Sequence, residues 1–289
     1  MSIAIAGASG NLGRRTADLL LARIDASELV LVTRDPAKLD DYASRGVHVR
    51  FGDFDQPDSL PNAFASVERL LLISASDLGR RVAQHLAAIR AATEAGVRHV
   101  AYTSIVNPSA STPIVAADDH RATEEALRAS GLEWTFLRNS IYADFQAGSI
   151  LGSADSGRFV HNQGDGLVAY VAREDCAAAA AAVLAGDGHA FEAYDITGPE
   201  LLTADDTVRI ASDAIGAPIE SVAVDDASYM NILVEYAGLP ADVAAAYATF
   251  GTGAREGYSA VLSNAVERLT GGPATPFAAV VAASIPVMA

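Results

Sequence analysis

The chain has 289 residues, of which 51% are hydrophobic, and its apolar runs are too short to span a bilayer, so we expect a globular protein with no membrane partner. Its net charge of −16 excludes a basic nucleic-acid surface, and a single lysine, Lys38, excludes Schiff-base chemistry in the second half. One cysteine and histidines without ligand spacing predict no disulfide and no metal site. The N-terminus lacks a basic, apolar leader, which favours a cytoplasmic location.

A glycine-rich turn follows the first predicted strand. The apolar run Ile3–Ala6 predicts a buried strand, and Arg14–Ile24 carries leucines at helical intervals. Between them, Gly7 permits a tight turn, Gly10 allows the backbone to approach a pyrophosphate, and Gly13 allows close helix–strand packing. A strand, a glycine turn and a helix N-terminus together predict a dinucleotide phosphate site. An ordinary glycine-rich turn is the alternative.

The second strand, predicted at Leu29–Thr33, completes a β-α-β unit. Arg34 follows it, about 20 residues past the last glycine, where NAD-specific proteins carry an acid for the ribose hydroxyls. With Lys38, this arginine would attract a 2′-phosphate instead. NADP(H) is therefore the preferred cofactor, NAD(H) is the alternative, and Arg34 could also be a solvated loop charge.

The third and fourth strands also end in candidate ligand-binding residues. Val47–Phe51 precedes Asp53 and Phe54, which are placed to flank an adenine or to form a plain turn. A short helix is predicted at Leu60–Val67. The next strand, Arg69–Ser74, runs into small residues that line the ligand crevice in open parallel sheets, namely Ser74, Ala75 and Ser76.

Strands and helices continue to alternate up to Asn139. The predicted helices are Val82–Ala95 and Asp118–Ser130, each followed by a glycine. The predicted strands are His99–Ser104 and Leu132–Leu137. This alternation predicts an α/β fold, a Rossmann-type doubly wound parallel sheet.

The pattern becomes irregular after Tyr142, which predicts a smaller α+β C-terminal lobe. We expect a Rossmann domain over residues 1–142 and a substrate-binding lobe over residues 143–289, interleaved with the sheet edge. The lobe is predicted to contain strands at 159–161, 168–170 and 194–197, and helices at 175–184, 204–215, 229–237, 241–250 and 258–269.

Several segments together resemble one family. They are G-A-S-G-N-L-G at the N-terminus, T-R-D-P-A-K, L-L-I-S, A-Y-T-S, an H-x-x-x-E helix, G-L-E-W-T-F-L-R-N-S-I-Y and A-R-E-D-C-A-A-A-A. Over residues 1–215 the chain resembles the NmrA-like atypical short-chain dehydrogenase/reductases, and within them the NAD(P)H:quinone oxidoreductase type 2 subfamily.

The resemblance implies a bound NADP(H) without flavin or metal. It implies a nicotinamide end near Tyr102–Ser104 and Asn139–Tyr142. The cofactor contacts that we expect are Gly7, Ser9, Gly10, Asn11, Leu12, Gly13, Arg34, Lys38, Asp53, Phe54, Ile73, Ser74, Ala75, Ser76, Tyr102, Asn139 and Ile141.

The chain departs from the wider superfamily in its proton donor. None of its nine tyrosines has a lysine four residues later, and His120 and Glu124 occupy the corresponding helix. The catalytic candidates are His120, Tyr142, Thr103 and Ser104, because His titrates near neutrality and the others carry hydroxyls. His120 could equally be a helix-face residue bonded to Glu124 or to a loop.

The predicted function is hydride transfer from NAD(P)H to a quinone or flat polycyclic aromatic acceptor. Such an acceptor forms a delocalised phenolate, so a strong proton donor is less needed. Tyr142 and Phe145 are the predicted substrate contacts, although Phe145 could instead belong to the core. Two alternatives are a tailoring reductase or monooxygenase of aromatic polyketide biosynthesis, and a non-catalytic dinucleotide sensor. A homodimer is one oligomeric state that the sequence leaves open.

Overall fold

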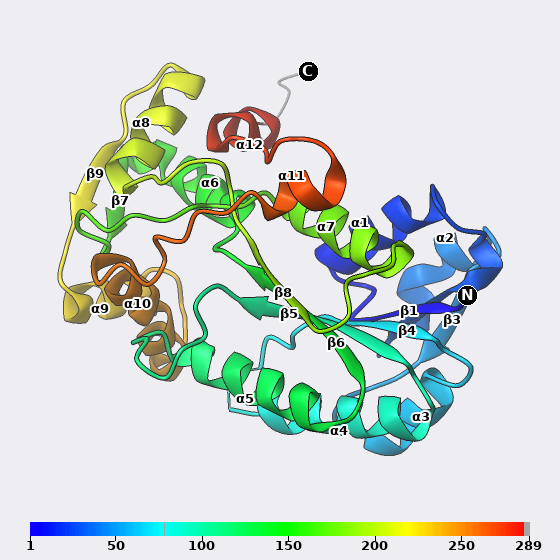
Figure 1. The fold of residues 1–289 in the computed structure, drawn as a ribbon. Coiled ribbons are helices and arrows are strands. Elements are labelled where there is room, and N and C mark those ends of the chain that lie inside the picture. The colour runs from blue at the N-terminus through cyan, green and yellow to red at the C-terminus, as the bar shows by residue number, and fades with distance from the viewer. Residues whose placement is uncertain (78, 286–289) are drawn as a thin grey trace. The chain divides into compact units, whose positions relative to one another are not determined.

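The computed structural model describes residues 1–77 and 79–285, which form two compact units (Figure 1). Unit 1 contains residues 1–105, 119–138 and 176–194, and unit 2 contains residues 106–118, 139–175 and 195–285. The chain thus passes between the units several times. The predicted boundary between residues 142 and 143 stays a prediction. The last four residues of the predicted C-terminal lobe, 286–289, lie outside the described part of the chain.

Within the described residues, unit 1 is built on a seven-stranded sheet in the order β3-β2-β1-β4-β5-β6-β8. The pairings that join β3, β2, β1, β4 and β5 are all parallel, which confirms the predicted Rossmann-type sheet. The strands are β1 (Ile3–Ala6), β2 (Leu29–Thr33), β3 (His48–Phe51), β4 (Arg69–Leu72), β5 (His99–Ile105), β6 (Glu133–Asn139) and β8 (Glu192–Ile196).

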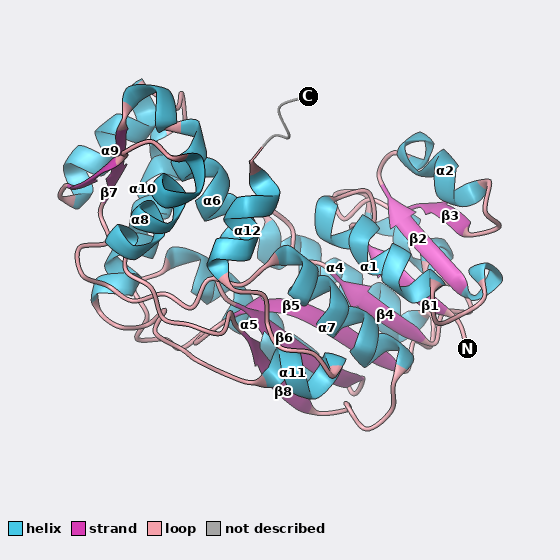
Figure 2. Ribbon diagram, turned by 90° about the horizontal axis from the view of Figure 1, so that it is seen from above, coloured by secondary structure: helices cyan, strands magenta, loops and turns pink. Residues whose placement is uncertain are grey.

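Helices cover both faces of this sheet, so its central strands are apolar on both sides. Figures 1 and 2 show α1 (Asn11–Leu21) and α7 (Arg173–Ala185) on one face. On the other face, α3 (Leu60–Ala63), α4 (Arg81–Glu94) and α5 (Val115–Ala129) pack a continuous core against the strands. Every residue of β1, β2, β4 and β5 is buried, as expected for a parallel sheet that is covered on both faces.

Unit 2 combines a two-stranded parallel sheet, β7 (Arg158–His161) with β9 (Glu220–Ala223), with several helices. Its core brings together apolar side chains of α6, α8 and α12. The helices of the unit are α6 (Ala143–Gly152), α8 (Ala204–Ile215), α9 (Asp226–Glu235), α10 (Ala241–Arg255), α11 (Ala265–Thr270) and α12 (Phe277–Ser284). The shorter elements of the chain are α2 (Asp40–Ala43) and the 3₁₀ turns Ala26–Glu28, Pro36–Leu39, Pro57–Ser59 and Ala154–Ser156.

Several predicted elements differ from the structure. The strand predicted at 194–197 in the C-terminal lobe is β8, which belongs to the seven-stranded sheet. The segment 168–170 is not a strand of either sheet. Val168 forms an isolated bridge with Leu202, and the Ala169 carbonyl accepts a hydrogen bond from the Gly198 N–H. The predicted helix 258–269 begins only at Ala265, because the Ser263 N–H donates to the Thr197 hydroxyl at 3.0 Å. The helix predicted at 60–67 ends at Ala63, and Ser66 then adopts a left-handed conformation.

None of the helices in the described part of the chain is long and apolar enough to cross a membrane.

Gly13 supplies a test of how the first helix packs. A Cβ at this position would lie 2.6 Å from the Gly7 carbonyl oxygen and 2.7 Å from the Ala8 Cα, and neither backbone atom can yield easily. We expect Gly13→Ala to lower the free energy of unfolding by about 1–3 kcal/mol, as overpacking does. Urea unfolding measures this change.

The matched control is Gly148→Ala in α6, where a Cβ would have no neighbour within 4 Å. That change should be neutral or stabilising by up to about 1 kcal/mol, because alanine favours helix. Equal effects of the two substitutions would contradict the close packing at Gly13.

Candidate active site

A cleft of about 350 Å³ lies in unit 1 where β1, β2 and β4 end and their loops begin. Open parallel sheets bind ligands at this edge. Eleven of the predicted cofactor contacts line it, namely Gly7, Ser9, Gly10, Arg34, Lys38, Asp53, Phe54, Ile73, Ser74, Ala75 and Ser76. Residues that we did not predict also line it, namely Ala6, Val32, Thr33, Asp35, Gly52, Asp77 and Gln84.

The glycine turn leaves the N-terminus of α1 open to an anion. Gly7 has φ +86, a left-handed conformation that favours glycine, and its amide donates to the Val32 carbonyl. Gly10 is the N-cap of α1, so no side chain caps the first amides of this helix. The first turn also carries no acid. A pyrophosphate fits such a site because free N–H groups and the helix dipole both favour negative charge.

Ser9 is oriented by a residue that the sequence did not single out. The buried Thr33 hydroxyl donates to Ser9 Oγ at 3.0 Å and accepts from the Asp35 N–H at 3.2 Å. Because Thr33 donates to Ser9, the serine hydroxyl can direct its own hydrogen elsewhere. Thr33 thereby ties the glycine turn to the loop that carries Arg34.

Arg34 and Lys38 place positive charge at the mouth of the cleft. Both side chains are exposed, and Lys38 Nζ lies 4.0 Å from an Asp35 carboxylate oxygen. Within residues 1–77 and 79–285, Arg34 forms no ion pair. The loop backbone is held by Arg14, which donates to the Lys38 carbonyl and to Asp41. This arrangement fits a 2′-phosphate.

The turn Asp53–Gln56 forms another part of the cleft wall. The Asp53 carboxylate accepts from the Asp55 N–H at 3.0 Å and from the Gln56 amide at 3.3 Å. Phe54 is half-buried and packs against the unit 1 core. The carboxylate is thus partly engaged by its own turn, and the Phe54 ring is fixed beside it.

Four predicted cofactor residues in unit 1 do not line the cleft. Asn11, Leu12 and Gly13 belong to the first turn of α1, where Leu12 and Gly13 are buried. The Tyr102 side chain is fully buried in the core between β5 and the helices α4 and α5. The reason is the alternation of β5, which directs Tyr102 away from the face that Ala101 and Thr103 occupy.

The buried polar side chains around β5 bond mainly to one another. Tyr102 Oη lies 2.8 Å from His120 Nδ1, and Ser104 Oγ donates to Glu124 Oε1 at 2.8 Å. Glu124 also accepts from Arg138 and Arg128. The Thr103 hydroxyl accepts from the Ser74 N–H at 2.8 Å.

These bonds change the interpretation of the catalytic candidates in unit 1. Burial, together with the charge of Arg81, lowers the pKa of His120 to about 3, so this ring is neutral near pH 7 and is not available there as a cationic acid. Its partner is Tyr102, not Glu124. Ser104 is committed to Glu124, and Thr103 supports the backbone of the cleft. We therefore do not assign His120 or Ser104 a role in proton transfer.

The remaining predicted residues belong to unit 2. The Asn139 amide donates to Tyr142 Oη at 3.4 Å, and the Arg173 guanidinium lies 5.2 Å from the centre of the Tyr142 ring. Asp144 anchors Arg173, because its carboxylate accepts a hydrogen bond from the Arg173 backbone N–H at 2.7 Å. Ile141 is half-buried against the unit 2 core. Asn139, Tyr142 and Arg173 thus form one polar cluster at the start of α6.

Phe145 stands one turn further along α6 and is 56% exposed. Its ring stacks with that of Tyr247 on α10 at 6.3 Å and 28°, and Tyr247 in turn contacts Phe250. Tyr247 is 40% exposed. A stacked, exposed aromatic pair offers a face on which a flat ring can pack.

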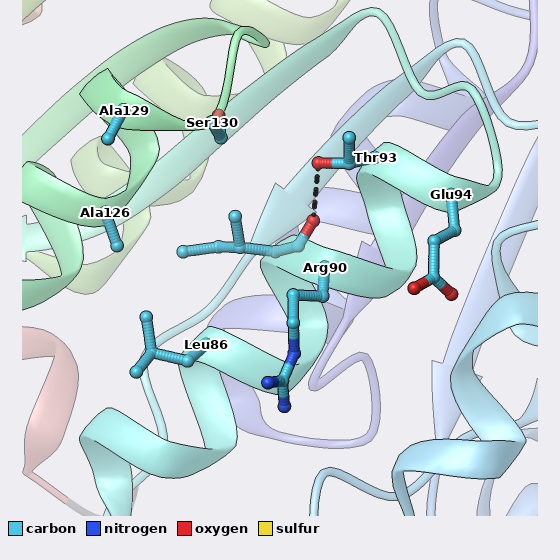
Figure 3. A pocket seen from close by; sticks show the side chains of 8 residues that line it. Leu86, Arg90, Thr93, Glu94, Ala126, Ala129 and Ser130 are labelled. Carbon is cyan, nitrogen blue, oxygen red and sulfur yellow. Dashed lines mark hydrogen bonds between the residues drawn. The ribbon is translucent and has the colours of Figure 1, made fainter.

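Another hollow of unit 1 lies on its outer surface, between α4 and the end of α5 (Figure 3). Leu86 and Arg90 of α4 line it opposite Ala126 and Ala129 of α5. It measures about 460 Å³ but has no glycine turn. The first cleft is therefore the better dinucleotide site.

A parallel sheet, an uncapped helix N-terminus after a glycine turn and two flanking cations define an NAD(P)-binding Rossmann protein. The chain belongs to the NAD(P)H-binding family, which it matches over residues 7–187.

Named relatives extend this assignment. The chain is 35% identical to Quinone oxidoreductase 2 of Escherichia coli K12 over 276 residues, which cover 96% of both proteins. The NADPH complex of this enzyme superposes with a TM-score of 0.93 over 97% of our chain and 99% of that one, at 34% identity. The resemblance to the NmrA-like quinone oxidoreductases is confirmed.

Two further relatives are reductases by name. Citrobacter triphenylmethane reductase, complexed with NADP(H), has a TM-score of 0.89 and 34% identity over 99% of this chain and 100% of that one. The NAD(P)H azoreductase of Xenophilus azovorans is 27% identical over 277 residues, covering 96% of this chain and 95% of the relative. The protein is an NAD(P)H-dependent oxidoreductase, and its cofactor is NADP(H). Among the described residues, no cluster of acids, histidines or cysteines could hold a metal.

The buried His120 predicts how stability depends on pH. Its folded pKa of about 3 lies below the usual 6.5, so unfolding takes up a proton between these values. The free energy of unfolding therefore falls as the pH drops through this window, by up to about 1.4 kcal/mol per pH unit.

The variant His120→Asn keeps an acceptor for the Tyr102 hydroxyl but cannot take up this proton. Urea unfolding between about pH 6 and pH 4.5 should show a wild-type slope that is steeper by about 1.4 kcal/mol per pH unit. Parallel slopes for the two proteins would contradict a neutral, buried His120.

Proposed function

We propose that this protein transfers a hydride from NADPH to a quinone or another flat polycyclic aromatic acceptor. The cofactor would occupy the unit 1 cleft, with its pyrophosphate at the N-terminus of α1 and its 2′-phosphate at Arg34 and Lys38. The adenine would lie against the wall formed by Asp53 and Phe54, and the segment Ile73–Ser76 would run beside the remainder of the dinucleotide.

The observation that carries the proposal is the engagement of the groups that could have donated a proton. His120 and Glu124 occupy the helix at which the wider superfamily carries its proton-donating tyrosine and lysine. Both side chains are buried and form hydrogen bonds with other side chains of the protein. A simple ketone needs a proton as the hydride arrives, because an isolated alkoxide is strongly basic. A quinone forms a delocalised, weakly basic anion, which suits a site without a strong acid.

The chain's own contribution is then binding and electrostatic stabilisation. Bound NADPH supplies the hydride from C4 of its nicotinamide. We assign the stabilisation of developing negative charge to the cluster of Asn139, Tyr142 and Arg173, in which the guanidinium over the Tyr142 ring favours negative charge nearby. The stacked rings of Phe145 and Tyr247 would hold the flat face of the acceptor.

The test is NADPH oxidation by the purified protein with a panel of simple and polycyclic quinones, with oxygen uptake followed in the same cell. We expect rapid oxidation that depends on the quinone. Oxygen incorporated stoichiometrically into product would favour the polyketide tailoring monooxygenase instead. Tight NADP binding without oxidation of any substrate would overturn the proposal and favour the dinucleotide sensor.

Charge reversal at Arg34 tests the placement of the 2′-phosphate. Arg34→Glu removes a charge-assisted hydrogen bond of about 1.5–3 kcal/mol and adds repulsion, so the KM for NADPH should rise about 100-fold. The KM for NADH should change less than about threefold. The control is Arg23→Glu, an exposed arginine outside the cleft that gives the same change in net charge. Equal losses for both cofactors would refute this role of Arg34.

The aromatic pair is tested by acceptor size. Phe145→Leu removes one stacked ring, worth about 0.5–1.5 kcal/mol, so the KM for a three-ring quinone should rise about fivefold. The KM for a one-ring quinone should barely change, because a small ring gains little from the pair. The control is Tyr236→Leu, which removes an 83% exposed ring from elsewhere in unit 2. Loss of stacking is refuted if both quinones respond equally.

A further inference from the structure

Ala75 lines the cleft, and its backbone N–H and carbonyl each form a hydrogen bond with a side chain. Its N–H donates to His85 Nε2 at 3.0 Å, and its carbonyl accepts from Arg81 Nε. Both side chains belong to α4, and both are more than nine-tenths buried. Ala75 lies in a segment without helix or strand hydrogen bonds, so these contacts replace a regular backbone ladder.

The partners of His85 fix its tautomer. Because a backbone N–H can only donate, Nε2 must be the unprotonated nitrogen. Nδ1 therefore carries the proton and donates to the Thr123 hydroxyl at 2.9 Å, and Thr123 in turn donates to the Asp119 carbonyl at 2.8 Å. Each of these hydrogen bonds has one donor and one acceptor, so the orientation of the His85 ring is uniquely specified.

The charged and titratable groups near His85 belong to Arg81, Asp119, Tyr102 and His120. Arg81 lies on the same helix and pairs with Asp119 at 3.6 Å, while Tyr102 Oη lies 3.5 Å from His85 Nδ1 and 2.8 Å from His120 Nδ1. No carboxylate among the described residues contacts the His85 ring directly. The ring is thus a neutral acceptor held from several elements.

We propose that His85 is a positioning residue for the cofactor, which acts by holding the Ala75 amide so that the segment Ile73–Ser76 presents a fixed surface to NADPH. This proposal rests on the cofactor placement given above. His85 does not line the cleft, so it works through the backbone and not by contact. Thr103 holds the adjacent Ser74 amide in the same way, from β5.

Two substitutions separate this role from a merely structural one. His85→Gln can place an amide oxygen near the position of Nε2 and so accept from Ala75. His85→Asn is too short to reach Ala75, although its amide can still bond Thr123. Both variants remove the imidazole from the core, so a loss that reflects core packing alone should affect both.

The measurements are NADPH binding by titration calorimetry and amide hydrogen exchange of the peptide containing Ala75. We expect His85→Asn to weaken NADPH binding about tenfold, the worth of one hydrogen bond of about 1.4 kcal/mol, and to accelerate exchange at Ala75. His85→Gln should bind within about threefold of wild type and keep the amide protected. Thermal melts of both variants report any loss of stability.

Three results would overturn the proposal: unchanged NADPH binding in His85→Asn, equal losses in both variants, or unchanged exchange at Ala75. None of these measurements uses a quinone, so they stand apart from the proposed reaction. Wild-type protein that binds NADPH but reduces no quinone would refute the reaction and leave the role of His85 intact.

Discussion

The close approach of α1 to the turn after β1 is the constraint on which the site depends. Only a residue without a side chain fits at Gly13, because the space for a Cβ is occupied by the backbone of Gly7 and Ala8. This contact brings the uncapped first turn of α1 to the carboxyl edge of the sheet. The electrostatic preference for a pyrophosphate at that edge is thus a consequence of packing in the core.

The loops of the cleft are held in place by buried side chains of unit 1. Thr33 orients Ser9, Thr103 holds the Ser74 amide, and His85 holds the Ala75 amide. These residues belong to strands and a helix of unit 1, so the loops of the cleft are held in place by the sheet and by α4. A preorganised surface of this kind lowers the cost of ordering loops when a ligand binds.

Much of unit 1 could be predicted because its strands are short apolar runs separated by glycines and helical patterns. Leu29–Thr33 was predicted at its observed bounds, and β3 and β5 within one residue. In unit 2, α6 and α12 were missed, since alanine, glycine and β-branched residues give them no clear polar face. The false helical turns at 258–264 look helical in isolation, but Thr197 binds Ser263 from far along the chain.

The loops that line the cleft could be located from the sequence because glycines and small residues at strand ends have a local meaning. The bonding partners of the catalytic candidates could not, because they depend on long-range contacts. Nothing in the local sequence shows that Tyr102 turns into the core and takes the Nδ1 of His120 as its partner. Likewise, His85 reads as an ordinary helix residue until the fold places it beneath Ala75.

The most direct measurement is a crystal structure of this protein with NADPH. The account predicts the pyrophosphate on the amides of the first turn of α1 and the 2′-phosphate between Arg34 and Lys38. It also predicts that Ala75 keeps its bond to His85 in the complex. A dinucleotide bound outside this cleft, or a 2′-phosphate pointing away from both cations, would contradict the account.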